Sequence, residues 1–317
     1  MELSESIHFL ELVSTPKKQE NLRKILLGYE ADFLNLPVLA TDPIEFPRRF
    51  FRQSDTKDVD NQDVRFITEF VAILSALYAY GNVKSIKNFL NFLLERIFPN
   101  SYNKNFERDS SYNKLQTLLD TISKLQESNL KPYRFQTAKD NLIILRTLGE
   151  MFSESKTLEQ FFLGEDLEEK INHFQKEFLE RIPQKSYGIR FWIGKGERGG
   201  SYKRILLFLR WMVRDQFPDF GIYKTIPKSN LLYPIDTHIN QFSRLLSISN
   251  RTTPNVQKSR EITDFFRQLE PEDPLRFDYL LTRIGILGMC KAKFANDICK
   301  KCKLHSHCIE FGSATGN

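Results

Sequence analysis

The stretch that decides the fold reads Gly199-Gly-Ser-Tyr-Lys-Arg-Ile-Leu-Leu-Phe-Leu-Arg-Trp-Met-Val-Arg214. After the two glycines, apolar residues occupy most positions, which predicts a helix from Ser201 to Asp215 with apolar residues nearly all round. Such a helix is buried in the middle of a domain. Lys203 lies in its first turn, near the core but facing a helix terminus.

Three influences disfavour the ammonium form of Lys203: the positive end of the helix dipole, partial desolvation and the adjacent charge of Arg204. A lysine in this state can act as an amine nucleophile near neutral pH. The ordinary alternative is a solvated lysine whose stem extends past the helix start into water.

The segment before this helix holds five glycines between Gly188 and Gly200. A glycine-rich turn that opens a helix exposes backbone N–H groups, and these can bind phosphate. Such turns also occur in every fold, so the position of this one directly before Lys203 is what makes it a candidate. The residues predicted to contact the phosphates of a nucleic acid are Lys195, Gly196, Arg198, Gly199, Gly200 and Ser201.

Asp236 precedes a second amphipathic segment, and Pro234 fixes the chain just before it. The pattern places Asp236 at the N-cap or in the first turn of a helix. A plain cap is the common role of such a residue and is worth about 1 kcal/mol. A carboxylate held at a helix head can also assist proton transfer and stabilise positive charge on a sugar. Both roles can hold together.

All four cysteines of the chain lie near its C-terminus, with eight, two and five residues between them. Clustered cysteines in a cytosolic protein more often hold a metal than form disulfides. Cys₄ ligation fits either a [4Fe–4S] cluster or zinc, although a zinc site typically shows two Cys-x₂-Cys pairs and this chain has one. The predicted metal ligands are Cys290, Cys299, Cys302 and Cys308.

A break in the helical pattern at Lys131-Pro-Tyr-Arg-Phe135 carries two aromatic residues and an arginine. Tyr133, Arg134 and Phe135 could stack on or wedge into a nucleic acid. The more common alternative is a loop whose aromatic side chains cover the core.

The composition of the 317-residue chain, with 41% hydrophobic residues and 27 phenylalanines, supports a sizeable core. Helical periodicity recurs, for example over 83–97, and strand signals are weak, so the predicted fold class is all-α. The net charge of +6 permits an acidic partner without requiring one. No apolar run reaches the roughly 18 residues that a membrane span needs. The N-terminus also lacks the form of a signal peptide, so a cytoplasmic location is expected.

These residues resemble those of the helix-hairpin-helix DNA glycosylases, in particular the endonuclease III branch. Pro234-Ile-Asp-Thr-His238 is similar to that family's Val-Asp-Thr-His segment, and the cysteine gaps are similar to its six, two and five. Gly199-Gly-Ser-Tyr-Lys203 lies where the family has Gly-Val-Gly-Arg-Lys. The family's Leu-Pro-Gly-Val-Gly hairpin is replaced here by Ile193-Gly-Lys-Gly-Glu-Arg-Gly-Gly200. The long lysine-to-aspartate interval is similar to that of archaeal 8-oxoguanine glycosylases, which lack the cysteines.

The resemblance implies a two-lobed, all-α glycosylase fold with a C-terminal iron–sulfur loop. Residues 1–45 would pack with a C-terminal lobe of residues 236–317, which carries the cysteine cluster, and residues 46–235 would form the lobe with the hairpin. The implied activity is excision of a damaged base from double-stranded DNA by a monomeric enzyme, with Lys203 as nucleophile, Asp236 as catalytic carboxylate and strand cleavage through a Schiff base. The alternatives are a monofunctional glycosylase that activates water and a non-catalytic DNA- or RNA-binding protein on the same scaffold.

Overall fold

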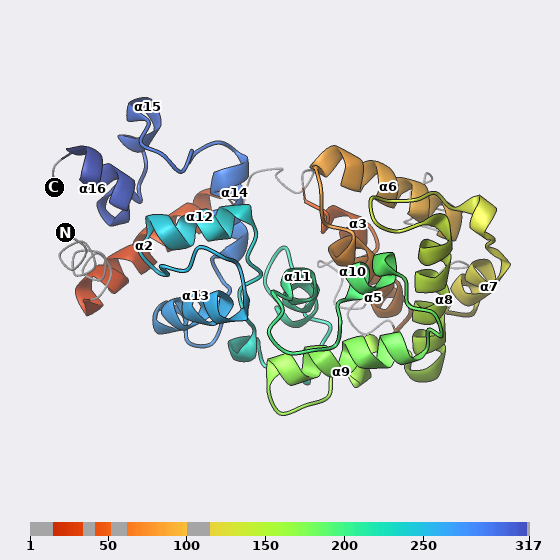
Figure 1. Cartoon of the computed structure of the whole chain (residues 1–317). Coiled ribbons are helices and arrows are strands. Elements are labelled where there is room, and N and C mark those ends of the chain that lie inside the picture. Colours follow the sequence, from red (N-terminus) through yellow and green to blue (C-terminus); the bar gives the residue numbers. More distant parts are fainter. Residues whose placement is uncertain (1–14, 34–41, 52–61, 100–114, 316–317) are drawn as a thin grey trace. The chain divides into compact units, whose positions relative to one another are not determined.

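The computed structural model describes residues 15–33, 42–51, 62–99 and 115–315, and in these ranges the chain is helical, with no strand. An isolated bridge between Tyr133 and Gln136 is the one β-type pairing found there. The all-α prediction is therefore confirmed for the described part of the chain (Figure 1). The α-helices are α2 (Pro16–Phe33), α3 (Glu45–Arg48), α5 (Gln62–Leu77), α6 (Val83–Ile97), α7 (Leu115–Lys124), α8 (Ala138–Ser155), α9 (Leu167–Glu180), α10 (Tyr187–Ile193), α11 (Lys203–Val213), α12 (Thr237–Leu245), α13 (Val256–Leu269), α14 (Asp278–Ile286), α15 (Asn296–Cys299) and α16 (Ile309–Thr315).

The chain divides into two compact units. The smaller comprises Met1–Val38 together with Pro227–Asn317, and the larger comprises Leu39–Ile226. The division into 1–45, 46–235 and 236–317 stays a prediction, and its residues 1–14 lie outside the described ranges. No helix in those ranges has both the length and the apolar character required to cross a membrane.

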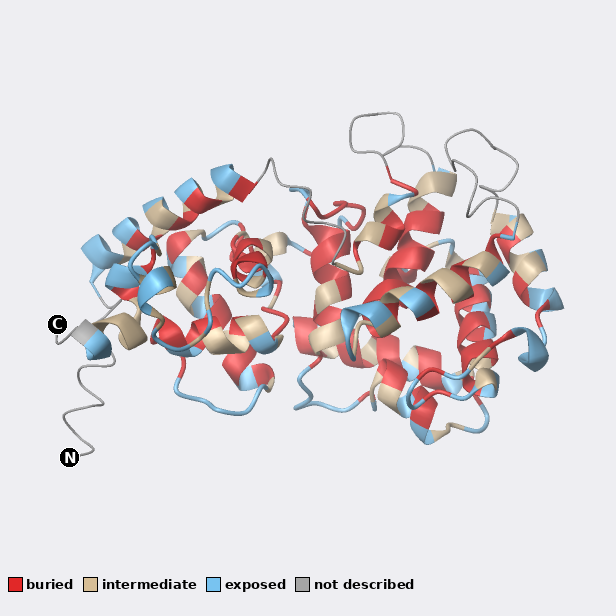
Figure 2. Cartoon of the chain, turned by 90° about the horizontal axis from the view of Figure 1, so that it is seen from above, coloured by how far each residue is buried: buried red, intermediate tan, exposed pale blue. Residues whose placement is uncertain are grey.

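The larger unit is built around α5 and α11, which pack against each other and are mostly buried (Figure 2). Ala72 and Ala76 of α5 are fully buried, and small side chains let neighbouring helices approach closely. The side chain of Arg210, on α11, is also buried, and its charge is balanced by an ion pair with Asp219 at 3.0 Å. The predicted burial of the apolar helix is confirmed, although the helix begins at Lys203 and ends at Val213.

Glu69 is a buried carboxylate in the middle of α5. Its Oε1 accepts hydrogen bonds from the Tyr223 hydroxyl (2.5 Å), the Leu158 N–H (2.7 Å) and the Thr157 hydroxyl (3.1 Å). Burial raises the pKa of Glu69 to about 7, against the opposing effect of these three donors. The carboxyl group thus ties two loops of the larger unit to its central helix.

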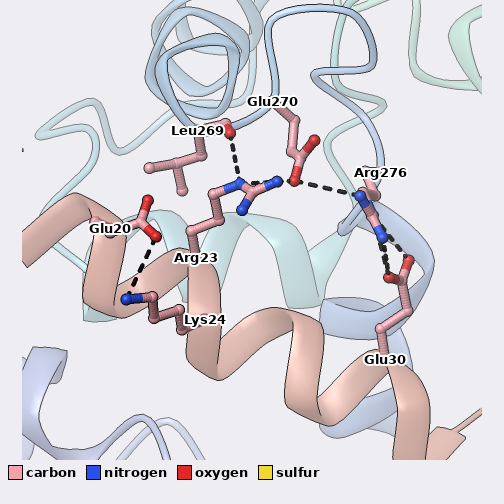
Figure 3. A network of polar contacts seen from close by, with 7 residues as sticks. All are labelled: Glu20, Arg23, Lys24, Glu30, Leu269, Glu270 and Arg276. Carbon is pink, nitrogen blue, oxygen red and sulfur yellow. Dashed lines mark hydrogen bonds and ion pairs between the residues drawn. The ribbon is translucent and has the colours of Figure 1, made fainter.

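The smaller unit combines α2 with the helices that follow residue 227. The buried face of α2 carries Leu22, Leu26, Tyr29 and Phe33, and the helix packs against α13 and α14. Polar contacts reinforce this packing (Figure 3): Arg23 donates to the Leu269 carbonyl at 3.1 Å and pairs with Glu270 at 3.0 Å, while Arg276 pairs with Glu30 at 2.8 Å. Segments from the two ends of the sequence therefore share one core.

Candidate functional site

A cavity of about 600 Å³ in the larger unit is formed by the end of α5, by α10, by the glycine-rich segment and by the start of α11. Six of the seven residues that the sequence singled out between Lys195 and Lys203 line it, namely Lys195, Arg198, Gly199, Gly200, Ser201 and Lys203. Gly196 instead lines a neighbouring hollow of about 610 Å³, together with Arg198. The structure thus brings the predicted nucleophile and the predicted phosphate contacts of this segment to one place.

The glycine-rich segment is clamped onto α9 by the buried side-chain amide of Gln175. Its Nε2 donates to the Ile193 carbonyl at 2.6 Å, and its Oε1 accepts from the Gly196 N–H at 3.1 Å. Gly194 lies between these two contacts with φ of +107°, and a Cβ there would stand 2.2 Å from Nε2 of Gln175. Only glycine meets both requirements, because other residues are strained at this φ and would collide with the amide.

A second anchor involves Glu168, also on α9. Its Oε1 accepts from the Gly199 N–H at 2.7 Å and lies 3.0 Å from the Tyr202 hydroxyl. Burial and the charge of Glu168 raise the pKa of Tyr202 to about 12, so this hydroxyl stays protonated. Two of the N–H groups predicted to bind phosphate, those of Gly196 and Gly199, therefore already donate to side chains. A phosphate at these positions would have to displace Gln175 or Glu168.

The two exposed cations of the segment differ in their surroundings. Arg198 pairs with Glu169 and lies 3.5 Å from Asp166, so much of its charge is already balanced. Lys195 is exposed and has no ion pair among the described residues. Of these two predicted contacts, Lys195 is the one whose charge is available to an anionic ligand.

Lys203 is the first residue of α11 and is half-buried. The preceding residue, Tyr202, has the left-handed conformation (φ 48°, ψ 10°) and supplies no side-chain cap, so the first turn of α11 keeps its positive end uncapped. Among the described residues, none forms a hydrogen bond or an ion pair with the side chain of Lys203. Its amine therefore lies at a cavity wall without a carboxylate partner in that part of the chain.

Arg204, the next residue, has a structural environment that the sequence did not predict. Its guanidinium donates to the Leu77 carbonyl at 2.8 Å and to the Phe191 carbonyl, and it lies over the rings of Tyr80 (5.0 Å) and Phe191 (4.8 Å). Burial lowers the pKa of Arg204 to about 10. The side chain joins the start of α11 to α10 and to the end of α5, and so it shapes the cavity.

Asp236 belongs to the smaller unit and is the N-cap of α12, a position that the sequence allowed for it. Its Oδ1 accepts from the Ile239 N–H at 2.7 Å. The other carboxylate oxygen is not used by the cap, and the side chain is half-buried. Its catalytic role stays a prediction.

The four cysteines are free, half-buried thiols in the smaller unit. Burial raises the pKa of Cys290 and of Cys308, and the charges of the other cysteine sulfurs raise them further, so the four groups lie within electrostatic reach of one another. The Ala295 N–H donates to Sγ of Cys299 at 3.3 Å. In the described ranges, however, no three or more His, Cys, Asp or Glu side chains are gathered closely enough to hold a metal ion. The four cysteine sulfurs match a Cys₄ metal centre in type and number, but they are not gathered around a common centre.

The fold and the cavity define a class of helical protein in which a clamped glycine-rich turn opens a buried helix with a half-buried lysine in its first turn. The chain belongs to the family described as "Protein of unknown function (DUF2400)", whose model matches residues 42–287. The matched segment includes Lys203 and Asp236 and ends before the first cysteine. No curated protein and no solved structure matches the chain.

Proposed function

We propose that this protein is a DNA glycosylase of the helix-hairpin-helix type that excises a damaged base and cleaves the strand through a lysine Schiff base. The observation that carries this function is the position of Lys203, a half-buried amine at the uncapped start of α11 in the wall of a cavity. The similarity of Gly199-Gly-Ser-Tyr-Lys203 and of Pro234-Ile-Asp-Thr-His238 to the glycosylase motifs points to the same chemistry.

In the proposed reaction, the unprotonated amine of Lys203 forms a bond to C1′ of the sugar as the bond from C1′ to the base breaks. The base leaves with the electron pair and takes up a proton. Opening of the sugar ring gives a protonated Schiff base on Lys203, and loss of a C2′ proton then breaks the C3′–O bond and cleaves the strand. The carboxylate of Asp236 stabilises the positive charge that develops on the sugar.

Double-stranded DNA with a damaged base is the proposed substrate. The positively charged side chains of Lys195, Lys203 and Arg204 line the cavity, and so does the carboxylate of Glu197. An excess of positive charge beside an uncapped helix start suits phosphate. Reaching a base inside a duplex requires its nucleotide to be flipped out, at a cost of a few kcal/mol.

The four cysteines are proposed to hold a [4Fe–4S] cluster, because a single Cys-x₂-Cys pair followed by five residues and a fourth cysteine suits the cluster better than zinc. When bound, the cluster would cross-link the loops around α15 and compensate the charge of four thiolates. Protein purified without oxygen should be yellow-brown, and Cys299→Ser should lose that colour. Colourless protein with stoichiometric zinc would refute this assignment.

The decisive experiment is reductive trapping on a panel of duplexes, each carrying one damaged base. Borohydride should fix a covalent adduct between the wild-type protein and DNA, and Lys203→Gln should abolish the adduct. Lys195→Gln is the matched control, since it removes an equal charge from the same cavity wall and should still be trapped. Asp236→Asn should bind DNA but release the base far more slowly.

Two other outcomes would replace this mechanism. If Lys203→Gln still releases the base but forms no adduct, water is the nucleophile and Lys203 is not. If the wild-type protein binds every lesion duplex and cuts none, the protein is a binding module and not an enzyme.

A further inference from the structure

Four aromatic side chains, two of them exposed and two half-buried, form one surface beside the Lys203 cavity, and we call this surface the aromatic platform. It consists of Tyr80, which follows α5, of Phe135, and of Tyr187 and Phe191 on α10. Tyr187 is 69% exposed and Phe135 is 42% exposed, although large apolar side chains are usually buried. Tyr80 and Phe191 also line the cavity, so the platform and the cavity wall are continuous.

The four rings contact one another as one group. The centroid of the Phe135 ring lies 4.4 Å from that of Phe191, 5.8 Å from that of Tyr187 and 6.3 Å from that of Tyr80. The rings of Tyr80 and Phe135 are nearly parallel, at 17°. Since each ring is supported by its neighbours, their outer parts present a preformed apolar surface to solvent.

The turn that carries Phe135 is held by hydrogen bonds on both sides. Tyr133 and Gln136 exchange backbone hydrogen bonds at 2.9 and 3.0 Å, and the Tyr133 hydroxyl donates to the Tyr80 carbonyl at 2.6 Å. The buried Gln136 side chain donates to the Gly188 carbonyl at 2.8 Å, which fixes the turn against α10. Tyr133 is buried and covers the core, whereas Phe135 is 42% exposed, and contact of this segment with a nucleic acid stays a prediction.

Positive charge surrounds the platform. Arg134 is exposed, and its guanidinium lies 5.9 Å from the ring centre of Phe135 and 6.0 Å from that of Tyr80. Arg190 is also exposed and follows Tyr187 by three residues on α10, which places both on one face of the helix. Arg204 lies under Tyr80 and Phe191. Rings bordered by arginines suit a ligand that has both flat bases and phosphates.

We propose that the aromatic platform stacks unpaired nucleobases of a DNA strand whose phosphates lie along Arg134, Arg190 and the cavity lysines. The choice of DNA as the nucleic acid rests on the proposed function. The platform then assigns the substrate class, which is DNA with an unpaired stretch beside the target nucleotide. Stacking on aromatic rings needs free base faces, which a closed duplex does not offer.

The test is fluorescence-anisotropy titration with labelled strands of equal length. One strand is oligothymidine, whose bases stack weakly on each other, and the second has the same sugars and phosphates but no bases. Wild-type protein should bind oligothymidine about a hundredfold more tightly than the base-free strand, because two stacked bases contribute about tenfold each. Phe135→Leu and Tyr187→Leu should each weaken oligothymidine binding about tenfold and leave binding of the base-free strand unchanged. Phe217→Leu is the matched control, because Phe217 is also an exposed phenylalanine (40%) with an arginine over its ring, outside the platform.

Equal losses on the two strands, or no loss on either, would overturn the stacking role. Equal binding of the two strands by wild-type protein would show that the platform serves a different class of partner, which also overturns it. Failure here is separable from failure of the proposed activity. If Phe135→Leu leaves base release and trapping on duplex lesions unchanged, the proposed glycosylase activity holds and the platform has no part in it. If the protein binds strands in a base-dependent way but excises no base, the stacking role holds and the proposed activity fails.

Discussion

The substitution Gln175→Met tests whether the glycine-rich turn is held in place by a single side chain. Methionine has nearly the length and volume of glutamine, so packing changes little while both hydrogen bonds are lost. The Ile193 carbonyl and the Gly196 N–H, which bond to Gln175 at 2.6 and 3.1 Å, would then be left without partners. A backbone group left unsatisfied in a buried place costs about 1–3 kcal/mol, so the loss of two partners is expected to lower the free energy of unfolding by about 2–6 kcal/mol.

Urea unfolding followed by tryptophan fluorescence suits this measurement, because the buried Trp192 lies on α10 next to the turn. Glu180→Gln is the matched control: the residue is exposed at the end of the same helix, α9, and its replacement should change stability by less than about 0.5 kcal/mol. A Gln175→Met protein as stable as this control would refute the clamp. The DNA adduct of the variant should also form more slowly, since Lys203 follows the displaced turn.

Two further predictions concern charge. Because burial raises the pKa of Glu69 to about 7 from an ordinary 4.5, the folded protein binds a proton that the unfolded chain releases at lower pH. The stabilisation from the protonated Glu69 is thus complete below about pH 4.5 and is lost as the pH rises through about 7. The free energy of unfolding falls by about 1.4 kcal/mol per pH unit over this range, which amounts to about 3 kcal/mol in total. Glu69→Gln should remove this pH dependence, which urea unfolding between about pH 5 and 8 measures. A stability difference between the variant and wild type that stays constant over this pH range would contradict the prediction. In DNA titrations at low salt, Lys195→Ala should weaken binding more than Arg198→Ala, because Arg198 already pairs with Glu169, and the opposite order would show that this ion pair opens for DNA.

Local periodicity was sufficient to predict long amphipathic helices, but not short ones such as α3 and α15. The pattern over 83–97 gave α6 with the bounds that the structure has, because its apolar residues recur on one face and Asn82 caps its first turn. The start of α11 was predicted two residues too early. Tyr202 leaves the helical conformation where its hydroxyl contacts Glu168 and Asn172 on α9, and no local pattern reports contacts between residues so far apart in the sequence.

The residues that line the cavity were predicted, but the contacts that hold them in place were not. Lys195, Arg198 and Lys203 were identified from charge and glycine content, and they do line one cavity. Gln175 gave no signal, because a glutamine in an amphipathic helix looks the same whether or not it clamps a distant turn. The neutralisation of Arg198 by Glu169 was also missed for this reason, since it depends on which face of α9 meets the turn.

The smaller unit has a consequence for the order in which the chain folds during synthesis. The helix α2 leaves the ribosome early, but α13 and α14, which cover the apolar face of α2, are made only after the entire larger unit. The larger unit is continuous in sequence and can complete its core first, as domains generally fold in the order of synthesis. Until then Leu22, Leu26, Tyr29 and Phe33 have no lasting cover, so the apolar face of α2 is open to chaperones while the larger unit is being made.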